Sequence, residues 1–184
     1  MTVALILAAG NGSRIGTPKA QIEIDGERLV DRAVSMSRQA GCQDVYVVLG
    51  AWLGEVAGAK IIINENWREG IGSSLRAGLT HISSTLEVES VIVCLVDLPG
   101  ITAEAVSQIL LTPGEIVMGT FGGKPGHPVK FSRTHWQEIM DGAVGDVGAQ
   151  AFLSTRSDIV FVELDEWASG RDIDTHADLE FFLK

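Results

Sequence analysis

Residues 5–20 read LILAAGNGSRIGTPKA, and this stretch indicates the fold of the whole chain. It begins as an apolar run, continues into small residues and glycines, and ends with an arginine and a lysine. Residues 3–8 predict a strand buried on both faces, because the strands of a parallel sheet are covered on both sides. In α/β sheets the loop after such a strand borders the ligand crevice. The stretch therefore predicts an α/β protein with a ligand site directly after its first strand.

Buried strands and amphipathic helices alternate further along the chain. The expected strands are residues 45–49, 60–63 and 91–96. The expected helices are residues 27–40, 71–83 and 102–111. Thr102 is the expected N-cap of the last of these helices. This order predicts a Rossmann-like α/β fold, a mostly parallel central sheet with helices on both faces.

The pattern changes after residue 112. Two short strands, residues 115–121 and 128–131, flank the segment GGKPG and predict a small β-hairpin or flap in the C-terminal half. A helix near residues 133–140, a short helix after GDVGA, a strand at 159–164 and a terminal helix from His176 follow. Because no repeat, linker or low-complexity tract interrupts the pattern, residues 1–184 are expected to form one domain.

The composition is that of a globular protein without a membrane span. The chain has 184 residues, 46% hydrophobic and 21% charged, with a net charge of −10 and a pI near 4.8. Such an acidic surface repels phosphate backbones, so nucleic-acid polymers are not expected as partners. No apolar run is long enough to cross a membrane and the N-terminus lacks signal-peptide features, so a cytoplasmic protein is expected. The two cysteines, Cys42 and Cys94, indicate neither a disulfide framework nor a zinc site.

The opening loop has the residues that an anion site needs. The side chains of residues 8–12 are short, so backbone N–H groups can approach a ligand and form an anion nest. Arg14 adds a planar guanidinium that matches phosphate oxygens, and Lys19 adds a point charge. The loop matches neither the Walker A motif nor GxGxxG. It therefore predicts a polyphosphate site, with a plain turn and two solvated cations as the alternative.

Several segments together resemble one known family. Residues 7–19 (LAAGNGSRIGTPK) are similar to the LAAGxSxRMGxxK signature of nucleotidyltransferases that use a nucleoside triphosphate and Mg²⁺. Residues 64–79 (NENWREGIGSSLRAGL) resemble the molybdenum-cofactor cytidylyltransferase branch of that superfamily. The further similar segments are VDLPGI (96–101), GHPVKF (126–131), GDVGA (145–149) and DIDTHADL (172–179). These segments span nearly the whole chain in the order found in the family.

The resemblance implies a specific reaction. A molybdenum-cofactor cytidylyltransferase moves CMP from CTP to the terminal phosphate of molybdopterin and releases pyrophosphate, with Mg²⁺ as cofactor. Residues 1–112 would form the nucleotide-binding part and residues 113–184 the acceptor-side part. Transient contact with a molybdoenzyme or its chaperone would also follow from membership in this branch.

The resemblance also implies site residues. Lys19, Arg14 and Asp97 would be catalytic, and Asp97 and Asp174 would hold Mg²⁺. Asp172 stays an alternative to Asp174, because alternate residues of an extended segment share one face. The nucleotide-binding residues would be Leu7, Ala8, Ala9, Gly10, Gly12, Ser13, Arg14, Lys19, Asn64, Ser74 and Gly78. The acceptor-binding residues would be Gly126, His127, Pro128 and Asp146.

Departures from the family pattern leave alternatives open. Leu98 stands where the metal motif has Gln, and Gln150 where the family often has Arg near the pterin. The alternative functions are a related transferase that uses GTP or acts on a sugar or alditol phosphate, and a molybdopterin carrier that has lost catalysis. For Asp97 and Ser74 the alternative roles are a turn cap and a helix N-cap.

Overall fold

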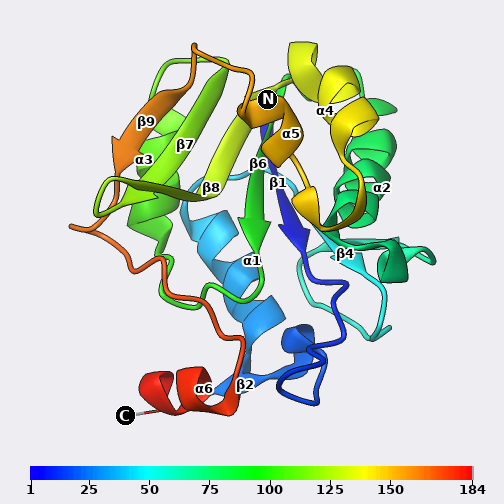
Figure 1. Cartoon of the computed structure of the whole chain (residues 1–184), viewed down its shortest axis with the longest axis vertical. Coiled ribbons are helices and arrows are strands. Elements are labelled where there is room, and N and C mark those ends of the chain that lie inside the picture. The colour runs from blue at the N-terminus through cyan, green and yellow to red at the C-terminus, as the bar shows by residue number, and fades with distance from the viewer. Residues whose placement is uncertain (184) are drawn as a thin grey trace.

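In the computed structural model, which describes residues 1–183, a seven-stranded sheet runs through the centre of the molecule (Figure 1). The strand order is β5-β4-β1-β6-β8-β7-β9. The strands are β1 (Thr2–Leu7), β4 (Val45–Leu49), β5 (Lys60–Ile63), β6 (Ser90–Leu95), β7 (Ile116–Phe121), β8 (Lys124–Ser132) and β9 (Val160–Glu163). The apolar run near the N-terminus thus becomes an interior strand, with β4 and β6 on either side.

The sheet is mostly parallel, as predicted. β1 pairs in parallel with β4 and β6, β4 with β5, and β7 with β9. Among the described strands β8 alone is reversed, because it pairs antiparallel with both β6 and β7. The predicted hairpin in the C-terminal half is therefore present as β7 and β8, joined at Gly122 and Gly123. Its two strands are part of the central sheet.

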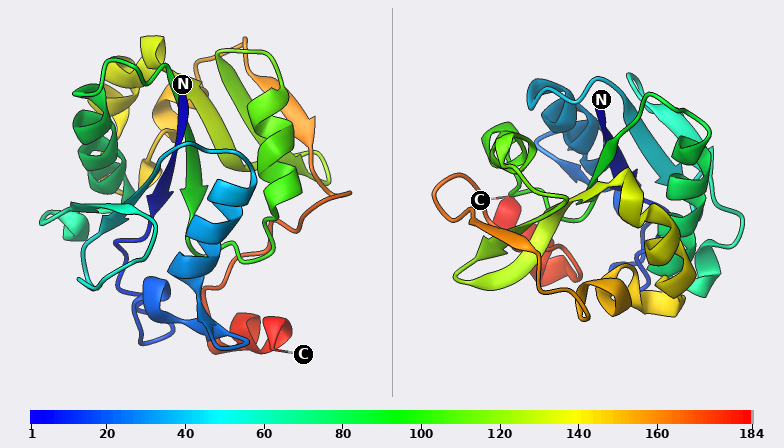
Figure 2. Two further views of the ribbon diagram at one scale, coloured as in Figure 1. Left: turned by 180° about the vertical axis from the view of Figure 1, so that it is seen from behind. Right: turned by 90° about the horizontal axis from the view of Figure 1, so that it is seen from above.

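Helices cover both faces of the sheet (Figures 1 and 2). One layer is α1 (Leu29–Gln39) and α3 (Ala103–Leu111); the other is α2 (Ile71–Ser83), α4 (Trp136–Gly142) and α5 (Gln150–Leu153). Each layer covers its own buried cluster, and side chains along β1 alternate between the two. Ile6 and Ala8 belong to the cluster under α1 and α3, whereas Leu7 and Ala9 belong to the cluster under α2.

A small hairpin precedes α1 and was not predicted. The 3₁₀ helix η1 (Lys19–Gln21) leads into β2 (Glu23–Ile24), which pairs with β3 (Glu27–Arg28). Asp25 and Gly26 connect these strands with positive φ angles of 55° and 78°, as two-residue Asp-Gly turns require. The helix predicted over residues 27–40 therefore begins two residues later than expected, because residues 27 and 28 pair with β2.

The predicted ends of other elements agree with the structure. Thr102 caps α3, its Oγ1 accepting a hydrogen bond of 3.2 Å from the amide of Ala105. α6 (His176–Phe182) lies beyond the carboxyl ends of β1 and β6 (Figure 1). The remaining 3₁₀ turns are η2 (Trp67–Glu69), η3 (Arg133–His135) and η4 (Gly145–Val147).

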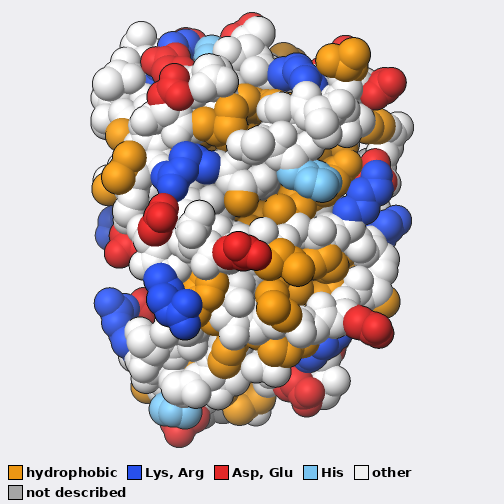
Figure 3. All heavy atoms as spheres, turned by 90° about the vertical axis from the view of Figure 1, so that its right-hand side faces the viewer, with side chains coloured by type: hydrophobic (Ala, Val, Ile, Leu, Met, Phe, Trp, Pro, Cys, Tyr) orange, Lys and Arg blue, Asp and Glu red, His pale blue; other side chains and the backbone are white. Residues whose placement is uncertain are grey.

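Other sequence expectations concern the thiols and the surface. Among the described residues Cys42 and Cys94 are free thiols, and burial raises the pKa of Cys42 to about 11 and that of Cys94 as well, so both stay protonated. No helix within residues 1–183 is long and apolar enough to cross a membrane. On the side where α2 and α4 lie, acidic and basic side chains are interspersed among apolar ones (Figure 3).

Candidate active site

The glycine loop after β1 folds back on itself at Gly12. Gly12 has a φ of 59°, and its carbonyl oxygen accepts hydrogen bonds from the amides of Ile15 and Gly16 at 2.9 and 2.7 Å. A Cβ at this position would lie 2.0 Å from the carbonyl oxygen of Thr17. Only glycine fits here, so Gly12 shapes the loop. Gly10, by contrast, is exposed and has open space around it, which leaves its backbone accessible to a ligand.

Four charged side chains meet where this loop faces the end of β6. Lys19 Nζ donates hydrogen bonds to Asp97 Oδ2 at 2.6 Å and to Asp174 Oδ1 at 2.5 Å. Arg14 Nη1 donates to the other oxygen of Asp174, Oδ2, at 2.7 Å. The amide of Ile173, a fully buried residue, donates to the carbonyl oxygen of Asp97 at 2.9 Å. This backbone bond fixes the C-terminal segment beside the strand end that carries Asp97.

The electrostatics of this cluster favour the charged forms of its members. Burial disfavours the ammonium of Lys19, but the two neighbouring carboxylates outweigh burial and raise its pKa above the ordinary value. The hydrogen bond from Lys19, aided by the charge of Arg14, lowers the pKa of Asp174. Lys19 and Asp174 therefore stay charged at neutral pH.

A cavity of about 520 Å³ opens beside this cluster and the glycine loop. Lys19 and Asp97 line it on one side, and Trp67 and Arg68 of η2 line another. The predicted nucleotide-binding residues that line it are Leu7, Ala9, Gly10, Ser13, Lys19 and Ser74. This nucleotide-side cavity thus brings together most of the loop residues that the sequence analysis named.

Five predicted nucleotide-binding residues do not line this cavity. Ala8 faces the cluster under α1 and α3, because side chains alternate along an extended segment. Gly78 lets α2 pack on β1, since a Cβ there would lie 2.6 Å from Leu5 Cδ1. Gly12 shapes the loop, and Arg14 reaches the site through Asp174 instead.

The fifth of these, Asn64, is buried and holds the start of α2. Its Nδ2 donates to the hydroxyls of Ser73 and Ser74 at 2.8 and 3.0 Å, and its Oδ1 accepts from the amide of Asn66 at 3.0 Å. Neither serine caps α2, whose N-cap position is Gly70. Asn64 therefore acts on the cavity through Ser74, which it positions.

A second cavity of about 580 Å³ adjoins the first on the same face of the sheet. Leu7, Ile71 and Asp146 line both, so the two share a boundary. Of the predicted acceptor-binding residues, Gly126, His127 and Asp146 line this acceptor-side cavity, while Pro128 is buried outside its lining. The apolar residues of its wall are Leu7, Ile71, Leu75, Val93, Met118, Val129, Phe131, Leu153, Ile159 and Phe161.

Polar groups are few in the acceptor-side cavity. Burial lowers the pKa of His127 to about 4, although the charge of Asp97 opposes this shift, so the imidazole is neutral at neutral pH. Arg156 also lines the cavity, but its guanidinium pairs with Asp158 at 2.5 Å. Gln150, at the position where the family often has Arg, lies in the same wall. The cavity is therefore weakly charged.

Sequence reasoning missed Arg68 and Arg156 as lining residues. The guanidinium of Arg68 lies 4.3 Å from the centroid of the Trp67 ring, and both residues line the nucleotide-side cavity. The Trp-Arg pair inside the NENWREG segment was a usable signal for this contact. For Arg156 no sequence signal exists, because it lies in a short polar stretch between α5 and β9.

The two carboxylates fit a divalent cation that phosphate oxygens help to bind. Asp97 and Asp174 converge on the same cationic atom, Lys19 Nζ, and Mg²⁺ is typically held by one or two carboxylates together with substrate phosphates and water. Within residues 1–183 no three His, Cys, Asp or Glu side chains cluster closely enough to hold a metal by themselves. Asp172 is exposed, so Asp174 is the carboxylate that the fold brings to the cluster.

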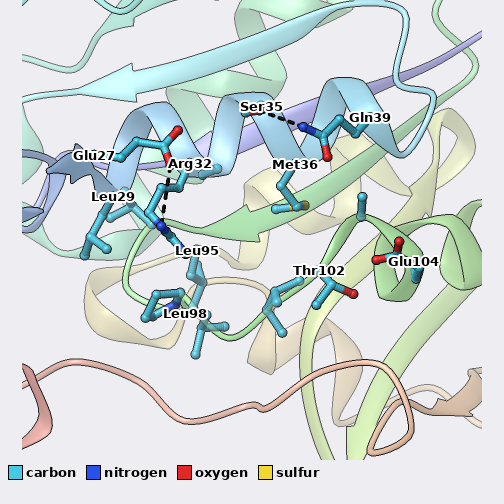
Figure 4. A pocket seen from close by; sticks show the side chains of 15 residues that line it. Glu27, Leu29, Arg32, Ser35, Met36, Gln39, Leu95, Leu98, Thr102 and Glu104 are labelled. Carbon is cyan, nitrogen blue, oxygen red and sulfur yellow. Dashed lines mark hydrogen bonds and ion pairs between the residues drawn. The ribbon is translucent and has the colours of Figure 1, made fainter. Parts of the chain in front are cut away.

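A third cavity, of about 310 Å³, lies on the opposite face of the sheet (Figure 4). It is bounded by α1 and by the segment from Leu95 to the start of α3. Its polar groups are partly paired with one another: Arg32 contacts Glu27, and Gln39 contacts Ser35 (Figure 4). This cavity lies behind the segment that carries Asp97, away from the glycine loop.

The geometry agrees with a match to a known family. MobA-like NTP transferase domains match residues 4–160 of the chain, which include the glycine loop, Asp97 and Asp146. The chain belongs to the MobA-like NTP transferase family. The protein is therefore a nucleotidyltransferase, and the glycine loop with Lys19 and Asp97 is the candidate active site of this MobA-like enzyme.

Several relatives of this MobA-like transferase match over nearly its whole length. Nicotine blue oxidoreductase from Paenarthrobacter nicotinovorans is 30% identical over 190 residues, 93% of this chain and 91% of the relative. Rv0371c from Mycobacterium tuberculosis H37Rv matches with a TM-score of 0.85 and 23% identity, over 99% of this chain and 97% of its own. Its homologue from Mycobacterium sp. strain JC1 matches with a TM-score of 0.83 and 27% identity, over 99% of this chain and 94% of its own. A structure of Rv0371c in complex with manganese matches with a TM-score of 0.82 and 21% identity, over 99% of this chain and 97% of its own.

Proposed function

We propose that this nucleotidyltransferase transfers CMP from CTP to the terminal phosphate of molybdopterin and releases pyrophosphate. The observation that supports this most is the pair of adjoining cavities, one beside the glycine loop and Lys19, the other mainly apolar. They share Leu7, Ile71 and Asp146, so a nucleotide in one and an acceptor in the other would meet at a common boundary. Two of the segments that resemble the family, residues 64–79 and 145–149, contribute residues to both cavities.

The proposed reaction is a single displacement at phosphorus. An oxygen of the acceptor phosphate forms a bond to the α-phosphorus of CTP, while the bond from that phosphorus to the bridging oxygen breaks and pyrophosphate leaves. The protein has to position the two reactants and stabilise the charge that develops. Lys19 would stabilise the α-phosphate, and Arg14 with the amides of the glycine loop would hold the β- and γ-phosphates.

Mg²⁺ is the proposed cofactor, and Asp97 and Asp174 would hold it. A divalent cation at this position neutralises charge on the phosphate oxygens. Asp97 lines the nucleotide-side cavity beside Lys19, and Asp174 contacts the same Lys19 ammonium. Manganese in a structure of Rv0371c is consistent with a divalent cation in this fold.

The choice of CTP rests on the size and polarity of the nucleotide-side cavity. Ala9 and Ser74 both line it, so either can contact the base. The methyl group of Ala9 narrows the space in comparison with a glycine at this position, which disfavours a purine. The Ser74 hydroxyl offers a donor and an acceptor to the base. A base that leaves such a buried group unpaired would bind more weakly.

The choice of acceptor rests on the apolar wall of the second cavity. A sugar or alditol phosphate would place hydroxyl groups against Met118, Val129 and Phe131, where they lose hydrogen bonds to water without replacement. A flat ring system such as a pterin buries apolar faces and directs its polar edge to a few groups. His127, Asp146 and Gln150 are among the polar groups that line the cavity and could meet that edge.

A second candidate function follows from the relative named nicotine blue oxidoreductase. It matches this chain at 30% identity over nearly its full length, and the mainly apolar acceptor-side cavity would also accommodate a flat aromatic redox substrate. In that case the glycine loop would bind the phosphates of a nicotinamide dinucleotide. The complete set of Lys19, Asp97 and Asp174 supports transfer instead, because hydride transfer makes no use of a carboxylate pair for a metal.

The deciding experiment measures pyrophosphate release with CTP, GTP, ATP and UTP, each with and without molybdopterin, in the presence of Mg²⁺. We expect release with CTP and molybdopterin together, and much less with GTP. Oxidation of NADH or NADPH with an aromatic acceptor is measured in parallel. Reduced-nicotinamide consumption without any pyrophosphate release would replace the first proposal by the second.

We also place the enzyme in the cytoplasm, in transient contact with a molybdoenzyme or its chaperone.

A further inference from the structure

Both carboxylates of the candidate metal site are already engaged by cations of the protein. Lys19 Nζ contacts one oxygen of Asp97 and one of Asp174, at 2.6 and 2.5 Å. The second oxygen of Asp174 contacts Arg14 at 2.7 Å. A divalent cation that binds Asp174 therefore competes with these two side chains for its oxygens.

The frame that carries the two carboxylates is held by other contacts. The amide of buried Ile173 donates to the Asp97 carbonyl oxygen, and the amide of Ser169 donates to the Gly100 carbonyl oxygen at 3.1 Å. The Asp178 carboxylate accepts hydrogen bonds from the backbone amides of Asp174 and Thr175. Because these bonds do not involve Lys19, they hold the backbone that carries the two carboxylates independently of the ammonium.

The charges make displacement by a metal alone unfavourable. Asp97 and Asp174 are balanced by Lys19 and Arg14, so an added divalent cation would leave the cluster with an excess of positive charge and Lys19 without a partner. A nucleoside triphosphate brings several negative charges, which give both side chains new partners. Within residues 1–183 no third His, Cys, Asp or Glu side chain joins this pair. Two carboxylates hold a metal weakly unless phosphate oxygens complete its coordination.

We propose that Lys19 acts as an internal substitute for the metal ion and makes metal binding depend on the nucleotide. In the free enzyme its ammonium occupies the position between Asp97 and Asp174. When metal and triphosphate arrive together, Lys19 moves to the phosphates and the metal takes its position. This inference rests on the proposed nucleotidyl transfer, and it adds that metal and nucleotide bind with strong positive coupling.

The test measures Mn²⁺ binding by electron paramagnetic resonance and calorimetry, without turnover. The nucleotide is a CTP analogue with a methylene group between the α- and β-phosphorus atoms, and its own affinity for Mn²⁺ in solution is subtracted. Wild-type enzyme should bind Mn²⁺ at least roughly tenfold more tightly with the analogue than alone, within the range typical of coupled ligands. Lys19→Met should bind Mn²⁺ alone roughly tenfold more tightly than wild type and gain less from the analogue.

Matched variants separate this role from a general charge effect. Lys60→Met removes the same charge from an ion pair with Asp44 and should leave Mn²⁺ binding unchanged. Arg14→Met should raise the affinity for Mn²⁺ less than Lys19→Met, because Arg14 contacts one carboxylate and its side chain is 73% exposed. Lys19→Arg keeps a cation in place and should keep Mn²⁺ binding weak. Adding Asp97→Asn to Lys19→Met should abolish the gain, which places the metal at this site.

The proposal is overturned if folded Lys19→Met binds Mn²⁺ alone no more tightly than wild type, or if Lys60→Met gains as much. Neither measurement involves an acceptor. Absence of CMP transfer to molybdopterin, with the Mn²⁺ coupling intact, would remove the proposed acceptor and leave this inference standing. Transfer without coupling would remove this inference alone.

Discussion

At the scale of single residues, Lys19 is the side chain on which the proposed chemistry depends most. It is half-buried, lines the nucleotide-side cavity and reaches both Asp97 and Asp174. Its raised pKa keeps it charged at neutral pH. A cation held beside the reacting phosphate would act where charge develops, in a site partly shielded from water.

We expect Lys19→Ala to reduce turnover by about two orders of magnitude or more, the scale on which such an electrostatic group contributes. The fold should remain, because Lys19 contributes no apolar core contact. Steady-state pyrophosphate release measures the loss, and thermal unfolding checks the fold. Near-normal turnover in a folded variant would show that Lys19 has no part in the transfer.

Ala9 is the residue proposed to select the base. Ala9→Gly removes one methyl group from the cavity lining and should raise the use of GTP relative to CTP without abolishing transfer. The measurement is kcat/KM for both triphosphates in wild type and variant. Ala8→Gly is the matched control, because Ala8 points to the opposite face of the sheet and should leave the ratio unchanged. A ratio that responds equally to both changes would mean that the base lies elsewhere.

At the scale of the elements, the glycine loop connects the end of β1 to η1 and so determines where Lys19 lies. Its shape depends on the positive φ of Gly12 and on the hydrogen bonds from Ile15 and Gly16 to the Gly12 carbonyl oxygen. The buried side chain of Ile15 anchors the loop to the core. Position and conformation of the loop therefore come from contacts within one short segment.

Gly12→Ala and Gly16→Ala form a matched pair that tests this loop. Both glycines have positive φ, at 59° and 76°, so alanine costs each roughly 1–2 kcal/mol of backbone strain. At Gly12 the added Cβ would also lie 2.0 Å from the Thr17 carbonyl oxygen, whereas at Gly16 it meets nothing within 4 Å. Gly12→Ala should therefore lower kcat/KM by on the order of a hundredfold, the effect of misplacing a reacting group by about 1 Å. Gly16→Ala should lower it far less. Equal effects would mean that the clash is relieved without moving Lys19.

At the scale of the whole molecule, one face of the sheet carries both cavities that we propose bind the substrates. β1 and β6 contribute to the floor of each, and α2, with the turn around η4, forms a wall that they share. The hairpin strand β8 brings His127 to the acceptor-side cavity. The other face, under α1 and α3, holds a separate buried cluster and its own smaller cavity.

This division predicts variants that affect one substrate and spare the other. His127→Ala should raise the KM for the acceptor and leave that for CTP near the wild-type value, because His127 lines the acceptor-side cavity and is absent from the lining of the other. His127→Asn, which keeps a hydrogen-bonding edge, should restore part of the loss. His81→Ala is the control, since His81 is exposed, packs against Tyr46 and lines neither cavity. A change confined to the KM for CTP would contradict the assignment of the two cavities.

The sequence by itself determined most of the fold, because its signals are local. Hydrophobic periodicity and helix end signals can be recognised from a short stretch of sequence alone. Examples are the apolar run of residues 3–8, the apolar spacing within residues 71–83 and the N-cap at Thr102. The hairpin at Asp25 and Gly26 has a local signal of the same kind, an Asp-Gly pair with positive φ angles. The sequence and its family resemblance likewise indicated that the loop glycines, Lys19 and Asp97 belong to the site.

Only the tertiary structure decided which of these residues meet. Asp174 lies 155 residues from Lys19 along the chain and reaches it because the C-terminal segment is fixed beside the end of β6, a contact that no local pattern encodes. The tertiary structure also places Ala8 and Ala9 on opposite faces of the sheet. It brings Asn64 into hydrogen bonds with two serines, and it packs Gly78 against Leu5. Each of these outcomes depends on which side of the sheet a side chain faces and on what packs there. The direction of each side chain is set when strands that are distant in the sequence pair with one another. The local sequence therefore indicates which chemical groups the site contains, and strand pairing determines where they lie.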